Sequence, residues 1–372
     1  MKAFCNRDSL LNAFSMVSGV IPARSPKPIL QNIRLSVDAE EGSVLMGTDL
    51  DIGIRHQVLG VRVECNGIVI LPTAQVGSIL RTCGDEELEL ISDNDHLTVR
   101  SQQAEFVLPV EDAGSFPEVP NFGSESYYVI RAAQLKKLIR RTVFATDLES
   151  ARYALGGVLL ELSGESIAMV GTDGRRLARM IAPAELANAP VTPTGTPVIP
   201  VKALKLIERN LIDDDASVHV AIQSGTAILI RTEDAVIYAR LVEGRFPRYQ
   251  DVFPANVDVR IPLEAGRLRL AIEQASIVTS DESRGVDFQF ASGVLKLSSQ
   301  AADVGTSHVD LPIDYDGKLV EITFDPRYLI DALKTIDDTT SITAELIDSK
   351  NAAVFKTPDY YTYVVMPLTR ER

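Results

Sequence analysis

The stretches Gly47-Thr48-Asp49, Gly171-Thr172-Asp173 and Gly305-Thr306-Ser307 place nearly the same three residues at intervals of about one third of the 372-residue chain. Solenoid repeats are much shorter, at roughly 20–50 residues. The observed interval instead matches the common size of a small domain, roughly 100–150 residues. The sequence therefore predicts three tandem copies of one domain.

Similar elements surround each of these stretches. Apolar residues three and four apart predict a first helix in each copy, beginning near the N-cap pair Asp8-Ser9 in the first copy. Proline, favoured in the first turn of a helix, precedes or opens a second helix. Gly-containing turns predict hairpins between the two helices. The expected first helices are residues 10–20, Ala132–Phe144 and Pro262–Ile277; the second helices are Gln75–Cys83, Lys202–Asn210 and Arg327–Ile336; the hairpin turns are Glu41-Gly42, Ser163-Gly164 and Ser292-Gly293.

The order helix, strands, helix, strands predicts an α+β fold in which helices cover one side of antiparallel sheet. We expect domains at residues 1–124, 125–256 and 257–372. Exposed sheet edges favour uncontrolled association. Pairing between consecutive copies, followed by head-to-tail closure with a second chain, would remove these edges.

Composition limits the class of protein. The apolar content is 45% and the charged content 24%, ordinary values for a globular chain. Met1–Asp8 lacks an apolar signal region, no apolar stretch nears the roughly 20 residues of a membrane span, and three cysteines lack CxxC spacing. We therefore expect a soluble, cytoplasmic protein. The net charge of −14 means that any duplex contact depends on basic residues gathered on one face.

An enzyme is the first alternative, with a hydrolytic site at Asp173 or at Asp213–Asp215. Four scattered histidines and the absence of HExxH, GxSxG and phosphate-loop motifs argue against it. A turn in which Asp173 precedes Gly174 suffices to explain the motif. We expect no catalysis, no metal and no cofactor.

Four further motifs, in register with the repeat, identify a family. They are Arg152–Gly157, Thr172–Ala178, Leu241–Tyr249 and Tyr363–Leu368. Together they resemble the bacterial DNA polymerase sliding clamp, the beta subunit of the replicative polymerase, over essentially the full chain. The resemblance implies a ring-shaped homodimer that holds duplex DNA without reading its sequence. It also implies a pocket for short peptides of the polymerase, the clamp loader and repair proteins.

The resemblance assigns residues to each role. The implied peptide pocket comprises Leu155, Thr172, Gly174, Arg175, Arg176, Leu177, Pro247, Val252, Val364, Met366, Pro367 and Leu368. The implied DNA-facing cations are Arg24, Lys136, Lys137, Arg140, Arg141, Arg152 and Lys202. Lys136 and Arg140 stand four apart and so share a helix face, although a solvated surface would show the same spacing.

The chain also departs from the family pattern. Arg175 stands where the best-known members have histidine and Asp251 where they have arginine, so we expect a different charge preference in the bound peptides. The implied ring seam, Gln102–Phe106 against Ser298–Asp303, carries little charge. We expect Phe106, Ile277 and Val278 to hold this seam, with a weak dependence on salt. A diverged clamp paralogue with a specialised repair role is the remaining alternative.

Overall fold

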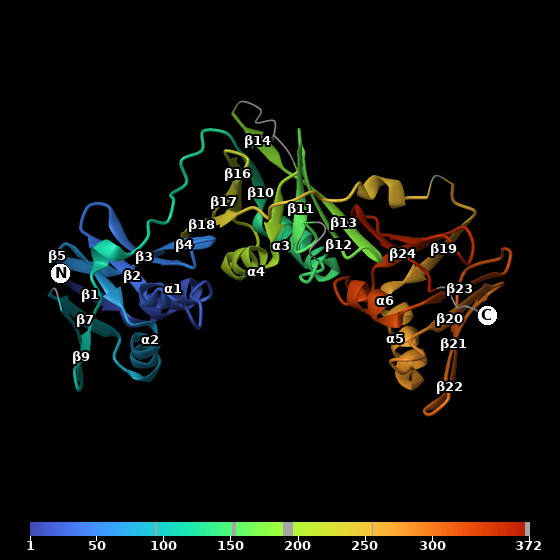
Figure 1. Cartoon of the computed structure of the whole chain (residues 1–372), viewed down its shortest axis with the longest axis horizontal. Coiled ribbons are helices and arrows are strands. Elements are labelled where there is room, and N and C mark those ends of the chain that lie inside the picture. Colours follow the sequence, from blue (N-terminus) through green and yellow to red (C-terminus); the bar gives the residue numbers. More distant parts are fainter. Residues whose placement is uncertain (94, 151–153, 189–195, 255, 369–372) are drawn as a thin grey trace. The chain divides into compact units, whose positions relative to one another are not determined.

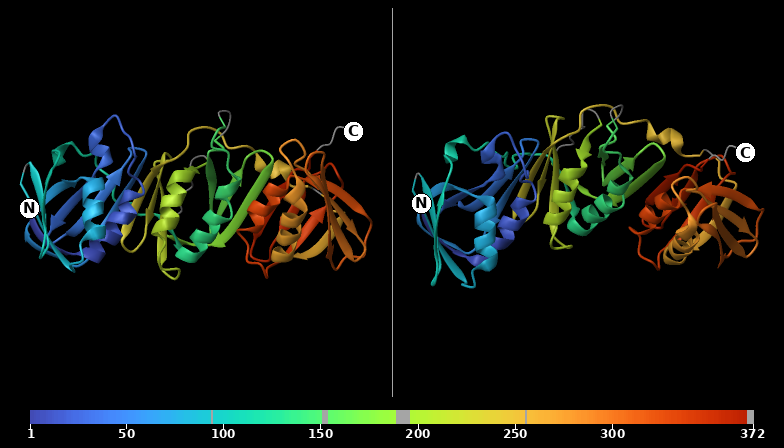
Figure 2. Two further views of the ribbon diagram at one scale, coloured as in Figure 1. Left: turned by 90° about the horizontal axis from the view of Figure 1, so that it is seen from below. Right: turned by 60° about the horizontal axis from the view of Figure 1, so that its bottom comes forward.

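The computed structural model describes the chain except residues 94, 151–153, 189–195, 255 and 369–372. Within the described residues, four antiparallel sheets and six α-helices are present. They separate into two compact units, one of residues 1–133, 184–195 and 202–241, and one of residues 134–183, 196–201 and 242–372. Figures 1 and 2 show the elements of each unit.

The first unit contains two sheets and two helices packed on each other, α1 (Arg7–Ser18) and α2 (Thr73–Thr82). The smaller sheet has the order β5 (Val61–Cys65), β1 (Lys2–Asn6), β7 (Glu87–Ser92), β8 (His96–Arg100), β9 (Glu105–Pro109). The larger sheet has the order β14 (Glu185–Ala187), β10 (Tyr127–Arg131), β16 (Ser217–Gln223), β17 (Ala227–Arg231), β18 (Ala235–Arg240), β4 (Ile52–Val58), β3 (Gly42–Thr48), β2 (Ile33–Asp38), β6 (Gly67–Leu71).

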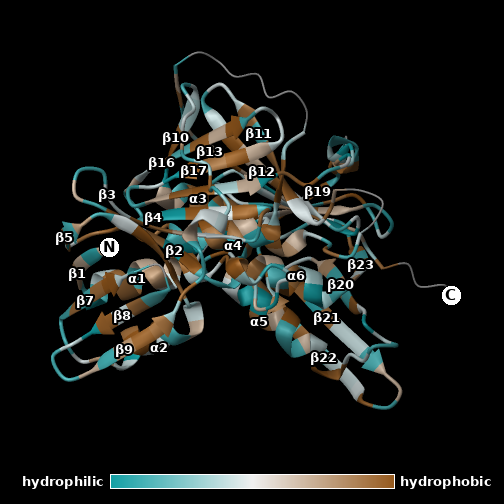
Figure 3. Cartoon of the chain, turned by 60° about the vertical axis from the view of Figure 1, so that its left-hand side comes forward, coloured by the Kyte–Doolittle hydropathy of each residue, from teal (hydrophilic) through white to brown (hydrophobic). Residues whose placement is uncertain are grey.

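The second unit repeats this plan around α5 (Ala265–Ala275) and α6 (Pro326–Leu333), which pack on each other. Its larger sheet has the order β15 (Val198–Pro200), β11 (Gly157–Ser163), β12 (Ser166–Thr172), β13 (Arg176–Pro183), β26 (Tyr361–Val365), β25 (Ala353–Lys356), β24 (Ser341–Leu346), β19 (Val259–Glu264). Its smaller sheet has the order β22 (Gly305–Pro312), β21 (Val294–Ala301), β20 (Val286–Ala291), β23 (Val320–Phe324). Figure 3 shows hydrophobic residues concentrated along β11, β12 and β13, whose side chains are mostly buried. The remaining helices, α3 (Ala132–Arg140) and α4 (Val201–Asn210), belong to the middle copy.

Strand pairing joins consecutive copies, which confirms the prediction made from exposed sheet edges. In the first unit, β18 of the middle copy pairs with β4 of the first. In the second unit, β13 of the middle copy pairs with β26 of the third, from Arg176 opposite Val365 to Met180 opposite Tyr361. The three predicted hairpin turns are also confirmed, with positive φ at Gly42, Gly164 and Gly293.

The start of each copy was predicted wrongly, because a strand precedes the first helix. The N-cap of α1 is Asn6, whose side chain accepts from the Ser9 amide at 3.0 Å, and not Asp8-Ser9. Residues 262–264 belong to β19 and not to a helix. Along β19, buried Ile261 and Leu263 alternate with exposed residues, and pairing with β24 stabilises this two-residue period over the helical one.

A buried charge cluster connects α3 to the loop before β26. The guanidinium of Arg141, 2% exposed, lies 2.9 Å from Asp359, and the Lys137 ammonium reaches the same carboxylate at 2.6 Å. Thr357 also donates its hydroxyl to Asp359. Partial burial by itself would raise the pKa of Asp359, but these three donors together hold it well below its usual range. Arg141 was predicted to face DNA; that prediction is wrong, because its charge is buried and neutralised inside the protein.

We expect Asp359→Asn to lower the free energy of unfolding by about 2 kcal/mol at pH 7. Removing one partner of a buried pair costs roughly 3–5 kcal/mol, and we reduce this figure because Asp359 is 37% exposed and partly screened by water. Lys137→Met, which removes a cation that is itself 38% exposed, should cost less than half as much. Urea unfolding curves measure both changes.

The loss of stability in Asp359→Asn should depend on pH. A carboxyl whose pKa is depressed on folding stabilises the protein above its unfolded pKa, about 3.9, and loses this contribution as pH falls through the folded pKa. The stability difference between the native chain and Asp359→Asn should therefore be full at pH 7 and shrink below about pH 4. A difference that stays constant with pH would contradict the role of this carboxylate.

Candidate functional site

Three of the predicted pocket residues form part of one apolar wall in the second unit. Leu177 on β13 and Val364 on β26 are direct partners across the paired strands. Leu155 packs into the same buried cluster, which also contains Phe246 and Tyr249. The strand pairing that joins the middle and third copies therefore also builds this wall.

A tight turn between β12 and β13 holds the predicted residues Thr172, Gly174 and Arg175. The Thr172 hydroxyl donates to the Arg176 carbonyl at 2.7 Å and accepts from the Gly174 amide at 3.1 Å. One carboxylate oxygen of Asp173 accepts from the amides of Arg175 and Arg176, each at 2.9 Å. Gly174 has φ 84°, which explains glycine at this position. The motif is a structural turn, and it lends no support to the enzyme alternative.

Arg176 connects the turn to neighbouring elements through ion pairs and a hydrogen bond. Its guanidinium, 10% exposed, bonds to Asp331 at 2.7 Å, to Asp173 at 3.0 Å and to the Phe144 carbonyl at 2.9 Å. It also lies over the ring of Tyr328, 4.8 Å from its centroid. Burial opposes the charge, but the hydrogen bond to Asp331 and the nearby acidic groups outweigh it and raise the pKa of Arg176. Arg176 thus fastens the turn to α6.

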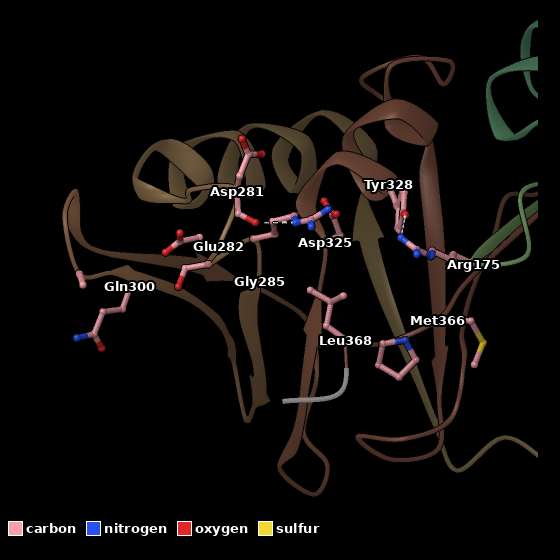
Figure 4. A pocket seen from close by; sticks show the side chains of 13 residues that line it. Arg175, Asp281, Glu282, Gly285, Gln300, Asp325, Tyr328, Met366 and Leu368 are labelled. Atoms are coloured by element: carbon pink, nitrogen blue, oxygen red, sulfur yellow. Dashed lines mark hydrogen bonds between the residues drawn. The ribbon is translucent and has the colours of Figure 1, made fainter. Parts of the chain in front are cut away.

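A hollow of about 850 Å³ lies beside this turn (Figure 4). Four predicted residues line it: Arg175, Met366, Pro367 and Leu368. The Arg175 guanidinium donates to the Tyr328 hydroxyl at 3.4 Å, and the Arg175 carbonyl accepts from the Met366 amide at 2.9 Å. We name this space the rim hollow.

Sequence reasoning missed the other side of the rim hollow, which the third copy supplies. Tyr328, Asp325 and residues 281–285 line it, together with Gln300 and Ala302. The Asp325-Pro326 pair does indicate the start of α6, where Asp325 caps the helix by accepting from the Arg327 amide at 3.1 Å. No local signal places that helix beside the turn at Arg175, because the placement depends on strands far apart in sequence.

The last two predicted pocket residues lie in the segment after β18. Pro247 is half-buried, and Val252, 42% exposed, ends a short 3-10 helix, η4 (Tyr249–Val252). The Tyr249 hydroxyl donates to Glu161 at 2.7 Å; burial, followed by this contact, raises its pKa to about 12. The hydrogen bond between Tyr249 and Glu161 holds the segment against the sheet. Val252 and its neighbour Asp251 are both exposed.

The predicted DNA-facing residues have different surroundings. Arg24 is exposed in the loop after α1, and Lys136, Lys137 and Arg140 lie on α3, where Arg140 is exposed. Lys202 on α4 is paired with Asp49, and its side chain is 51% exposed. Arg152 lies outside the described residues.

At the expected seam, Phe106 is half-buried on β9, a strand at the edge of its sheet. Ile277, 74% exposed, and half-buried Val278 follow α5 in η5 (Ser276–Val278). The prediction of an edge at Ser298–Asp303 was wrong. Ser298 to Ala301 belong to β21, which has a partner on both sides, and among the described strands the edge of that sheet is β22.

No helix in the described part of the chain is long and apolar enough to cross a membrane. Nor do the described residues contain a group of three or more His, Cys, Asp or Glu side chains arranged to hold a metal ion.

Three α+β copies joined through their sheet edges define the DNA clamp class of fold. Models of the DNA polymerase III beta subunit match its N-terminal domain at residues 1–120, its central domain at 129–248 and its C-terminal domain at 250–369. The chain belongs to the DNA polymerase III beta subunit family.

Individual relatives agree with this assignment over the full length. The chain is 29% identical to the beta sliding clamp of Escherichia coli strain K12, covering 99% of this chain and 100% of that protein. It is 28% identical to the clamp of Pseudomonas aeruginosa, covering 97% and 98%. The structure of a Pseudomonas aeruginosa clamp bound to griselimycin has a TM-score of 0.91 at 28% identity, and that of the Bacillus subtilis clamp 0.92 at 24%; the first covers 100% of both chains, the second 100% and 99%.

The neighbouring arginines Arg175 and Arg176 provide a matched pair of variants. We expect Arg176→Met to lower the free energy of unfolding by about 3 kcal/mol, because Asp173 and Asp331 would lose their partly buried counter-ion. Arg175→Met, at an exposed position, should change stability by less than about 0.5 kcal/mol.

Thermal or urea unfolding of the two variants distinguishes these effects. Equal losses of stability would contradict the separation of a bracing arginine from a rim arginine.

Proposed function

We propose that this chain is a processivity clamp: two copies enclose duplex DNA and tether the replicative polymerase, the clamp loader and repair proteins. Membership of the sliding-clamp family over the whole chain carries this proposal. Since the DNA lies in the bacterial cytoplasm, we place the protein there. The specialised paralogue finds no specific support, because the wall and most of the cations expected of an ordinary clamp are retained.

The pocket proposed for partner peptides consists of the apolar wall and the rim. Leu155, Leu177 and Val364 are buried and form the apolar base of the proposed pocket, and Met366, 42% exposed, is a flexible side chain that adapts to different anchors. A short peptide on such a surface should bind at around micromolar affinity, which is roughly −8 kcal/mol. This affinity allows one partner to replace another.

At the rim, an acidic residue of a bound peptide should be favoured only directly beside Arg175, because Asp281, Glu282 and Asp325 line the rest of the hollow. Arg175 is exposed and lies on the lining of the rim hollow, where its guanidinium bonds only to the neutral Tyr328 hydroxyl among the contacts described. A carboxylate beside the anchor side chains would gain a charge-assisted contact with it.

DNA would be held by basic side chains without base readout. Exposed Arg24, Arg140 and Lys202 and half-buried Lys136 are the proposed phosphate contacts, together with Lys137, whose ammonium already pairs with Asp359. Such contacts are independent of sequence and weaken with salt. Arg152 is retained as a proposed contact from the resemblance alone.

A loading experiment tests enclosure. The chain is loaded onto nicked circular DNA with the cognate loader and ATP, and the circle is then cut. Retention on the circle followed by release after cutting is expected, because a closed ring can leave only over a free end. Equal retention on both forms would contradict enclosure and indicate ordinary DNA binding.

The proposed ring seam pairs β9 of one chain with β22 of the other. The one charged side chain of β9, Glu105, is already held within its own chain by Arg100 at 2.6 Å. Phe106, Ile277 and Val278 would supply the apolar contacts. β22 carries one carboxylate, the exposed Asp310, and neither strand has a lysine or arginine, so the attraction across the seam should come mainly from strand pairing and apolar burial.

We accordingly expect the dissociation constant of the dimer to change by less than about threefold between 50 mM and 500 mM NaCl, because exposed ion pairs are screened by salt whereas apolar contacts are not. Analytical ultracentrifugation measures this change. Phe106→Ala should weaken the dimer at every salt concentration. A rise of tenfold or more with salt in the native chain would show that the seam is electrostatic.

A further inference from the structure

Among the strands that the structure describes, β23 is the last of the smaller sheet in the second unit, and one of its edges has no partner strand. One side of β23 pairs with β20, from Val286 opposite Phe324 to Phe290 opposite Val320. On the other side, the Leu368 amide donates to the Thr323 carbonyl at 2.8 Å. Within the described residues, this is the single backbone hydrogen bond to that side.

The register identifies which backbone groups remain. Successive residues of a strand direct their amide and carbonyl groups to opposite sides. Since the Thr323 carbonyl faces the open edge, the amide and carbonyl of Glu321, two residues earlier, face it as well. They form the next available pairing position along the edge.

A hollow of about 1340 Å³ runs beside this edge, and we name it the edge hollow. Residues 318–323 and residues 287–289 of the paired strand β20 line one side, and residues 347–350 line the other, so the hollow extends over the face of these two strands as well as along the edge. The second side is a preformed turn in which Asp348 accepts from the amides of Lys350 and Asn351 at 2.8 and 2.9 Å. Leu319, 60% exposed, adds an apolar surface at the start of the strand.

The corresponding edge strands of the other copies are covered. In the middle copy, the Val242 amide donates to the Val198 carbonyl of β15 at 2.8 Å, as Leu368 does to Thr323. There the chain continues through the buried residues Phe246 and Tyr249. In the first copy, η2 (Ala113–Ser115) packs against β6. In both copies the segment leading to the next domain covers the edge strand, whereas among the described residues of the third copy only Leu368 does so.

We propose that the edge of β23 is a second docking site, where an extended segment of a partner protein adds as a strand next to Leu368. This inference rests on the proposed function, since Leu368 lines both the rim hollow and the edge hollow, which therefore adjoin at this residue. A partner anchored in the pocket could continue along β23 without leaving the surface. Main-chain pairing supplies affinity in such strand addition. Leu319 favours an apolar side chain in the added segment, and exposed Lys350 favours a polar one elsewhere.

The test uses the full chain and the replicative polymerase subunit of the same organism. In the native chain, hydrogen exchange of the Glu321 amide should slow by about tenfold or more when polymerase is bound, because the amide becomes paired. Glu321→Pro removes this donor, and proline is tolerated where an edge strand faces solvent. It should weaken polymerase binding by roughly fivefold, about the value of one hydrogen bond. Glu321→Ala keeps the backbone amide and should bind within about twofold of the native chain.

Two further variants separate the outcomes. If Met366→Lys leaves polymerase binding unchanged, the proposed pocket function fails. If Met366→Lys abolishes binding but Glu321 exchange is unaffected by polymerase in the native chain, strand addition alone is overturned. If removal of residues 369–372 accelerates Glu321 exchange without polymerase, the edge belongs to the chain's own end, which also overturns the proposal.

Discussion

Hydrogen bonding between β13 and β26 is the constraint on which the candidate pocket depends. It makes the middle and third copies one eight-stranded sheet within the second unit. It also places Leu177 directly opposite Val364, and Arg176 opposite Val365. A side chain from either strand alone would form half a wall. The candidate pocket is therefore a property of the junction between two copies, and no single copy contains all of its residues.

Buried charge then fixes the geometry of this junction. Arg141 and Lys137 bind Asp359 before β26, and Arg176 binds Asp331 on α6. Each pair joins a residue of the middle copy to one of the third. Such pairs add little net stability compared with apolar packing, but breaking one leaves an expensive unpaired charge. They consequently restrict how the two copies can rotate against each other and hold the rim residues in place.

The sequence predicted the elements that depend on neighbouring residues, but not the contacts between residues far apart in the chain. Apolar periodicity located all six first and second helices to within four residues at each end, and glycines located the hairpin turns, because both depend on neighbouring residues. The strands β1, β10 and β19 were not predicted, because each is followed directly by a helix and pairs with strands far along the chain. Arg141 illustrates the same limit for the site: its charge and helical spacing are those of a surface residue, and only Asp359, more than two hundred residues later, accounts for its burial. Tyr328 was missed for the same reason, since its position beside Arg175 follows from the strand pairing of β13 and β26.

The three copies also show how a repeat acquires different functions at equivalent places. All three end in strands followed by a segment that crosses an edge strand, β6, β15 or β23. Where a further domain follows, this segment also connects to the next copy, and its buried aromatic residues fix it across the edge. In the third copy, Leu368 is the one described residue whose backbone bonds to this side of the edge strand, and a hollow lies beside it. Exposed edges promote association unless they are covered, which is why we propose a partner strand at this one. The position next to Met366, Pro367 and Leu368 makes the partners that use the pocket the natural ones to do so.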